Sequence, residues 1–188
     1  MDEQREFSQM RMPKTFGHLD TDRSIGLYIV LNFITSGIYG IVIFTTLGLD
    51  INTIASHHDG KKTMHYCLLI FLVAPFTLGI GALVWFHRLT NRIVNELARR
   101  NLSYPITVSN YWLLNVLWPI VIGFGYGIFL VIAIPTGPIA VISNITIVTV
   151  IVASLFVGIL GSVGPFMYIN KVFKSMNLLA SDFNKNGT

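Results

Sequence analysis

The sequence predicts an all-α fold, an integral membrane bundle of about four transmembrane helices with internal repeats. Apolar residues make up 53% of the 188 residues and charged residues only 12%, about half the charged share of a soluble domain. No Asp, Glu, Lys or Arg occurs between Asn101 and Asn170. A soluble fold of this length would need a charged surface there, whereas helices surrounded by lipid need none.

The first apolar run, over residues 25–49, follows a polar tail at 1–24 and carries no charge. It exceeds the roughly 20 residues that a helix needs to cross a bilayer core, so we expect a membrane span there. Ser36 and Gly40 lie four residues apart, a spacing that lets two helices approach closely in lipid. Together with Gly37 they are expected to pack against another helix.

The second apolar run, over 66–86, predicts a second span with a kink at Pro75, where the proline removes a backbone hydrogen bond. Gly79 and Gly81 are its candidate helix-packing residues. Beyond this run, apolar residues recur every four positions and charged residues occupy the other faces. We therefore expect the helix to continue into the cytoplasm as an amphipathic extension over 87–104.

Two further spans are expected at 111–134 and 139–168, separated by a turn at Pro135-Thr-Gly-Pro138. The series Gly123-x-Gly125-x-Gly127 neither follows a strand nor opens a phosphate-binding helix, so it indicates close helix packing rather than nucleotide binding. Small residues recur every four positions in the fourth span and predict a second packing seam. They are Ser154, Gly158 and Ser162.

The C-terminal segment, over 169–183, is amphipathic again and is expected to be a second cytoplasmic extension. Its apolar side is predicted to dock a partner protein. The residues on that side are Ile169, Phe173 and Met176. Residues 25–186 are thus expected to form a single membrane domain.

The basic residues predict the orientation of the spans. With the N-terminus inside, four Lys and Arg fall in the tail, four between 87 and 109 and three after the fourth span, so eleven of the thirteen are cytoplasmic. Only Lys61 and Lys62 then lie outside. In an alternative layout, residues 25–49 form a re-entrant hairpin bent at Ser36-Gly37, which brings Lys61 and Lys62 inside as well. In the four-span layout both termini are cytoplasmic.

Two stretches of the chain match each other at an offset of 42 residues. The matched pairs include Thr35 with Thr77, Gly37 with Gly79 and Phe44 with Phe86. With one span in each unit, the two units would be inverted relative to one another. Inverted repeats are found in many transporters.

The string Ser36-Gly-Ile-Tyr-Gly-Ile41, followed by Leu47 and then Asp50-Ile51-Asn52, resembles the repeated unit of the bacterial DUF4234 membrane-protein family. That unit reads roughly C-G-I-Y-G-I-Y-W-x-Y-K-L-x-x-D-I-N. The second stretch keeps Thr77, Gly79-Ile80, Trp85 and Leu89, and the matching segments cover residues 23–100. The resemblance implies a multi-pass protein of the bacterial inner membrane and implies no catalytic or binding residue. The aromatic part of the unit is replaced by Val42-Ile-Phe-Thr-Thr46.

Three histidines lie in the first connection, close to Asp50 and Asp59 in the sequence. They are His57, His58 and His65. Imidazole and carboxylate are zinc ligands, but no recognised ligand spacing is present, so we expect no metal site and no cofactor. No serine or threonine has a nucleophile-elbow context or a partner base, so no catalytic residue is predicted.

These features predict a non-enzymatic membrane protein, an accessory or scaffold subunit of a bacterial membrane complex. Its expected partners are the lipid bilayer and either another membrane protein or a second copy of itself. The alternative is a small transporter or channel for a neutral or hydrophobic solute, as a homo-oligomer. The repeats favour the transporter, and the lack of charge within the spans favours the scaffold. The net charge of +4 is spread over the loops and predicts no nucleic-acid binding.

Overall fold

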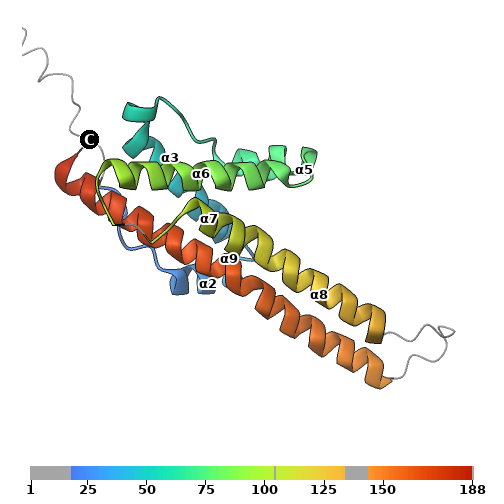
Figure 1. Ribbon diagram of the computed structural model, residues 1–188. Helices are drawn as coiled ribbons and strands as arrows, with labels where there is room; N and C mark the ends of the chain where they lie inside the picture. Colours follow the sequence, from blue (N-terminus) through green and yellow to red (C-terminus); the bar gives the residue numbers. More distant parts are fainter. Residues whose placement is uncertain (1–17, 104, 134–143, 188) are drawn as a thin grey trace, which may run out of the picture.

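The computed structural model describes residues 18–103, 105–133 and 144–187, and within these every regular element is helical. The elements form three hairpins (Figure 1). The first pairs α2 (Ile25–Ile34) with α3 (Ile38–Asp59). The second pairs α4 (Tyr66–Leu68), the π-helical segment η1 (Leu69–Val73) and α5 (Ala74–Phe76) with α6 (Ile80–Arg99). The third pairs α7 (Val108–Asn110), the π-helical segment η2 (Tyr111–Leu117) and α8 (Trp118–Ala133) with α9 (Asn144–Asn186). The all-α prediction is confirmed for this part of the chain.

The helix expected over 25–49 is interrupted, because the backbone reverses between α2 and α3. Ser36 and Gly37 at the turn have positive φ values of 50° and 94°. The amide N–H of Gly40 donates to the side-chain oxygen of Asn32 across the turn, at 2.9 Å. The expected single span is therefore two antiparallel helices, as in the hairpin alternative.

The helix expected over 66–86 is interrupted in the same way. Leu78 and Gly79 have φ values of 49° and 84°, and the expected kink at Pro75 lies in the last turn before this reversal. The hydroxyl of Thr77 accepts the amide N–H of Gly81 at 2.9 Å. In the first hairpin, Thr35 accepts the amide of Tyr39 at 3.0 Å. Both turns thus use a threonine to satisfy an amide that the break leaves without a helical partner.

The helix α6 runs without a break through residue 87, so the amphipathic segment expected over 87–104 begins inside it and ends at Arg99. The expected span over 111–134 corresponds to 108–133 in the structure. The expected segments 139–168 and 169–183 are joined, from residue 144 onward, in one helix, α9, which contains Pro165. The predicted turn at 135–138 lies outside the described residues.

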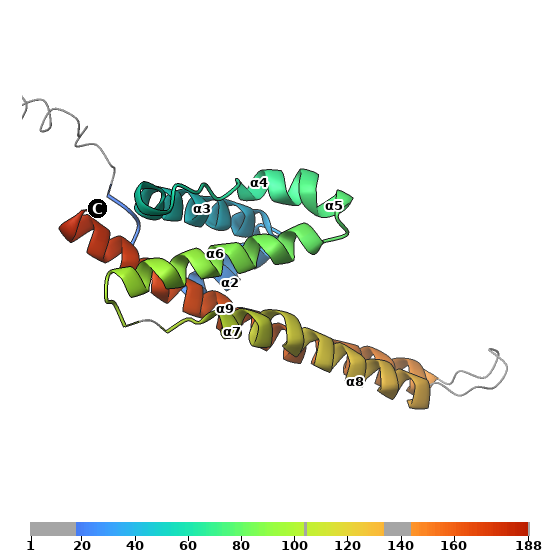
Figure 2. The same ribbon diagram turned by 45° about the horizontal axis from the view of Figure 1, so that its top comes forward.

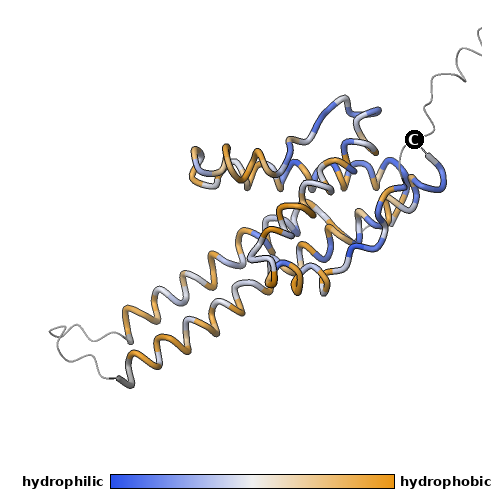
Figure 3. Tube along the Cα trace, turned by 180° about the vertical axis from the view of Figure 1, so that it is seen from behind, coloured by the Kyte–Doolittle hydropathy of each residue, from blue (hydrophilic) through white to orange (hydrophobic). Residues whose placement is uncertain are grey.

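Three helices are long and apolar enough to cross a membrane, over Ile38–Asp59, Val108–Ile132 and Ile147–Asn186. The third hairpin extends well beyond the other two (Figures 1 and 2). Hydrophilic residues gather at one end of the molecule and hydrophobic residues toward the tips of the hairpins (Figure 3). We call this hydrophilic end, where α3, α6 and α9 finish and α2 begins, the polar end.

Candidate functional site

Three arginines hold the helix ends together at the polar end. Arg23, just before α2, pairs with Asp50 of α3, and its side chain is only 1% exposed. The side-chain amide of Asn177 on α9 accepts the backbone N–H of Arg23 at 3.2 Å and donates to its carbonyl at 3.0 Å. One residue therefore joins the beginning of α2 to α3 and α9.

Arg92 on α6 fixes the connection between α3 and α4. Its guanidinium donates to both carboxylate oxygens of Asp59, at 2.7 and 3.1 Å. It also donates to the side-chain oxygen of Asn52 at 2.7 Å and to the carbonyl of Lys61 at 2.9 Å. Because the contact with the carboxylate is bidentate, it fixes the relative orientation of the two side chains as well as pairing their charges. The end of α3 is thereby held against α6.

Arg100, at the end of α6, completes this set by reaching α9. Its guanidinium donates to Glu96 at 2.8 Å and to Asp182 at 2.6 Å. Burial alone would raise the pKa of Glu96, but hydrogen bonds and positive charge from Arg99 and Arg100 outweigh burial and hold that pKa below its ordinary value. Glu96 is therefore ionised at neutral pH, and the ends of α6 and α9 are joined by an ion-pair network.

The tips of the first two hairpins carry exposed apolar side chains in place of charged ones. Phe33 and Phe76 are 86% and 83% exposed, and Leu78 is 92% exposed. Leu78 also has a φ of 49°, a region that a bulky side chain seldom adopts. This leucine is almost wholly exposed, so packing within the chain does little to offset its backbone strain.

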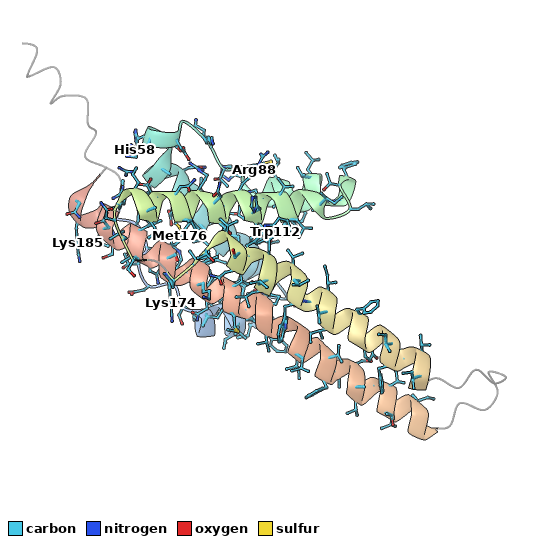
Figure 4. The ribbon with its side chains drawn as sticks, viewed as in Figure 1. His58, Arg88, Trp112, Lys174, Met176 and Lys185 are labelled. Atoms are coloured by element: carbon cyan, nitrogen blue, oxygen red, sulfur yellow. The ribbon has the colours of Figure 1, made fainter. Side chains whose placement is uncertain are left out.

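A groove of about 850 Å³ lies along the second hairpin and runs from the polar end toward the tip. Basic and polar side chains line one part of it and apolar groups the other. The first set is Lys61, Lys62, Arg88, Asn91 and Arg92, and the second includes Val73, Ile80, Gly81, Val84 and Trp85. Arg88 projects from α6 on the side of the α3–α4 connection (Figure 4). The lining of this groove combines positive charge with apolar surface.

One protein-family model matches the part of the chain that contains the groove. The model of a domain of unknown function, DUF4234, matches residues 23–95. We call these matched residues, 23–95, the DUF4234 domain. The domain begins at Arg23 and ends inside α6, so it contains the first two hairpins and the whole groove lining. The third hairpin lies outside the match. No curated protein and no solved structure matches the chain.

The small residues predicted within the DUF4234 domain fall into two groups. Ser36, Gly37 and Gly79 are turn residues with positive φ rather than parts of a helix face. Gly40 and Gly81 lie where the two arms of their hairpins approach closely. A Cβ atom on Gly40 would lie 2.7 Å from Asn32, and one on Gly81 would lie 2.6 Å from Val73.

The small residues predicted outside the domain behave differently from one another. The hydroxyl of Ser154 contacts the hydroxyl of Tyr126 on α8. Ser162 donates to the carbonyl of Ile159 in its own helix at 2.7 Å. A Cβ atom on Gly158 would meet nothing within 4 Å. Of this seam, Ser154 forms a side-chain contact between α8 and α9.

The predicted docking stripe is not available to a partner. Phe173 and Met176 are 1% and 0% exposed and belong to the core of the bundle, and Ile169 packs against that core. Segment 169–183 is amphipathic because its apolar side packs inside this chain, against the DUF4234 domain. Phe173, for example, stacks edge-on against Tyr28 of α2, with ring centroids 5.5 Å apart.

The first connection does not bring its histidines into a metal site. Among the described residues, no group of three or more His, Cys, Asp and Glu side chains could hold a metal ion. Asp59, the nearest carboxylate in the sequence, is engaged by Arg92. Sequence reasoning missed the groove, whose basic residues could have been found because Lys61, Lys62 and Arg88 directly flank the charge-free stretch 63–87.

Proposed function

We propose that this chain is a non-enzymatic membrane protein, an accessory or scaffold subunit of a complex in a bacterial inner membrane, with both termini cytoplasmic. The two hairpins of the DUF4234 domain enter the bilayer from the cytoplasmic side and return to it, and only the third hairpin crosses. The single observation that carries this proposal is the shared polar end, where arginines join the beginning of α2 and the ends of α3, α6 and α9.

The short length of α2 and the length of the third hairpin support this layout. The ten residues of α2 measure about 15 Å at 1.5 Å per residue, which reaches about halfway through a hydrocarbon core of about 30 Å. The arm at 108–133 is long enough to cross the whole core. With two re-entrant hairpins, all thirteen Lys and Arg lie on the cytoplasmic side, in place of the eleven that four spans would give.

The tips of the hairpins support membrane entry. A strained leucine with an exposed side chain is unfavourable in water, whereas in lipid the side chain of Leu78 is well solvated. The turns also satisfy their own backbone, which is a requirement for irregular structure within a bilayer. The amide of Gly37 donates to the carbonyl of Asn32, and that of Gly79 to Ala74, both at 2.8 Å.

The third hairpin supports a scaffold role. Its apolar helices are barely buried within the chain. An apolar stretch of 18 residues within Val108–Ile132 has 0% of its residues buried, and one within Ile147–Asn186 has 6%. Gly123 and Gly127 lie four residues apart on α8, and a Cβ atom on either would meet nothing within 4 Å. A helix edge of this kind permits close approach of a second helix in lipid. The transporter alternative relied on inverted repeats, and two hairpins that both return to the polar end are not inverted.

The proposal is tested by co-purification from native membranes at endogenous expression level. We expect the Gly123→Leu/Gly127→Leu double variant to accumulate normally, because the added carbons meet open space within the chain, but to recover fewer partner proteins. The control is Val131→Leu, at a position that is already apolar and 78% exposed. A parent protein that recovers neither a partner nor a second copy of itself would contradict the scaffold role.

A further inference from the structure

The mouth of the groove carries an uncompensated positive charge. Lys61, Lys62 and Arg88 form no ion pair among the described residues, while the charge of Arg92 is met by Asp59. Three positive charges therefore remain at the mouth. Asp59 is the only acidic residue between Asn52 and Asn95, and it is already engaged by Arg92.

The deeper part of the groove is apolar. Ile80 and Val84 are 63% and 43% exposed, on the face of α6 that lines the groove. Gly81 lies between them without a side chain. Trp85 also lines the groove, and its indole N–H donates to the carbonyl of Met64 at 2.9 Å. Within the described part of the chain, no charged side chain lines the groove beyond Arg88 toward the tip.

The groove therefore changes from cationic to apolar in the direction in which the second hairpin enters the bilayer. A phospholipid in the cytoplasmic leaflet has the matching order, with its phosphate at the surface and its acyl chains toward the midplane. The volume of about 850 Å³ lies within the range of sites that enclose small ligands. A soluble anion would use only the mouth and would leave the apolar walls without a partner.

We propose that this groove binds an anionic phospholipid. Lys61, Lys62 and Arg88 hold the phosphate headgroup, and an acyl chain lies along Val73, Ile80 and Val84. The site rests on the proposed function in one respect, because it requires the tip of the second hairpin to lie in the cytoplasmic leaflet.

The test is native mass spectrometry of the purified full-length chain in a neutral detergent, titrated with phosphatidylglycerol or phosphatidylcholine of identical acyl chains. We expect phosphatidylglycerol to bind roughly tenfold more tightly, because a lysine or arginine near an anionic lipid headgroup contributes measurably to binding. The Lys61→Gln/Lys62→Gln/Arg88→Gln variant should bind the two lipids equally. Inorganic phosphate at millimolar concentration should not displace the bound phosphatidylglycerol.

The matched control removes three positive charges elsewhere, as Lys171→Gln/Lys174→Gln/Lys185→Gln on α9, where Lys174 and Lys185 lie away from the groove (Figure 4). This variant should keep the lipid preference of the parent protein. Val84→Trp places a large ring in the apolar part and should weaken binding of both lipids several-fold, with an unchanged melting temperature as evidence of folding. Val84 is half-exposed, so the ring has room to enter the groove.

Equal binding of the two lipids by the parent protein would overturn the proposal. Equal loss of preference in both triple variants would also overturn it, because a general charge effect would then explain the preference. Displacement by inorganic phosphate would identify a simple anion site, and a dimer peak lost in Val84→Trp would identify a second copy as the occupant. Membrane orientation is measured separately by cysteine labelling, so a lipid test that fails while labelling supports re-entry removes only the lipid site.

Discussion

Leu78 and Gly79 are adjacent and share the left-handed region of backbone space. Glycine adopts this region without strain, whereas leucine does so at a cost. Ser36 and Gly37 repeat the pair in the first hairpin. Each tip is therefore a two-residue reversal whose second position requires glycine, and the first tolerates a side chain that extends away from the protein.

Gly79→Ala tests the backbone requirement separately from packing. A Cβ atom at Gly79 meets nothing within 4 Å, but the residue has a φ of 84°. We expect Gly79→Ala to lower the free energy of unfolding in detergent by about 1–2 kcal/mol, the cost of placing an L-residue in this conformation. Gly123→Ala is the control, because its Cβ atom also meets nothing and its φ is ordinary. Thermal melts should show a lower melting temperature for Gly79→Ala and no decrease for Gly123→Ala.

Gly40→Leu tests packing within the first hairpin. The added side chain would meet Asn32, whose side-chain oxygen lies 2.7 Å from the position that a Cβ atom on residue 40 would occupy. Overpacking of this kind costs about 1–3 kcal/mol, so we expect a lower melting temperature in detergent with normal membrane insertion. Val42→Leu, at a position that is 52% exposed, should melt with the parent protein. Identical melting of all three proteins would show that the arms of the hairpin do not pack at Gly40.

The depressed pKa of Glu96 predicts a pH dependence at the polar end. Hydrogen bonds from Arg99 and Arg100 stabilise the ionised form in the folded state. The stabilisation is complete above the unfolded pKa of about 4.3 and is lost as the pH falls through the lower folded pKa. The melting temperature of the parent protein should therefore fall on acidification below about pH 4. At neutral pH, Glu96→Gln should have a lower melting temperature than the parent protein. On acidification its melting temperature should fall less.

At the scale of the element, a buried ion pair joins the beginning of α2 to α3. Removing Arg23 alone would leave Asp50 partly buried and unpaired, and breaking a buried pair in this way costs about 3–5 kcal/mol. We expect Arg23→Met to lower the melting temperature more than Arg23→Met/Asp50→Leu, in which no buried charge is left unpaired, because Asp20, the other carboxylate near Arg23, is 59% exposed. A double variant less stable than the single variant would contradict this account of how α2 is held.

Hydropathy predicted the helical class and the third hairpin but not the first two. A charge-free run of 25 residues has the same composition whether it crosses a bilayer or folds back on itself, so length alone favoured a span at 25–49. The distinguishing signal is local. The charge-free run 24–49 has Ser36-Gly37 at its centre, and Asn32 and Thr35 are placed to satisfy the amides exposed by a break there.

The groove and the docking stripe show why sites were harder to predict than elements. Amphipathicity identified an apolar side on 169–183 but could not say that the chain's own core covers it. The groove draws residues from the α3–α4 connection and from both arms of the second hairpin. Its basic mouth depends on Arg92 neutralising Asp59, a pairing across 33 residues that sequence spacing does not reveal.

At the scale of the whole molecule, the charged residues gather at one end and the apolar hairpin tips point away from it. Charge-free stretches at 24–49, 63–87 and 101–170 each correspond to one hairpin, and the basic residues between them meet at the polar end. The first two stretches are too short to cross a bilayer twice, whereas the third is long enough. The central claim is therefore that the DUF4234 domain enters the membrane from one side without crossing it.

Cysteine labelling in intact cells tests this claim most directly. The background variant is Cys67→Ala, because Cys67 is exposed. Single cysteines replace His58 in the last turn of α3, Leu102 after α6 and Thr136 between α8 and α9. The account predicts that an impermeant thiol reagent labels Thr136→Cys at once and labels His58→Cys and Leu102→Cys only after the membrane is permeabilised. Labelling of His58→Cys in intact cells would contradict it, because α3 would then cross the membrane.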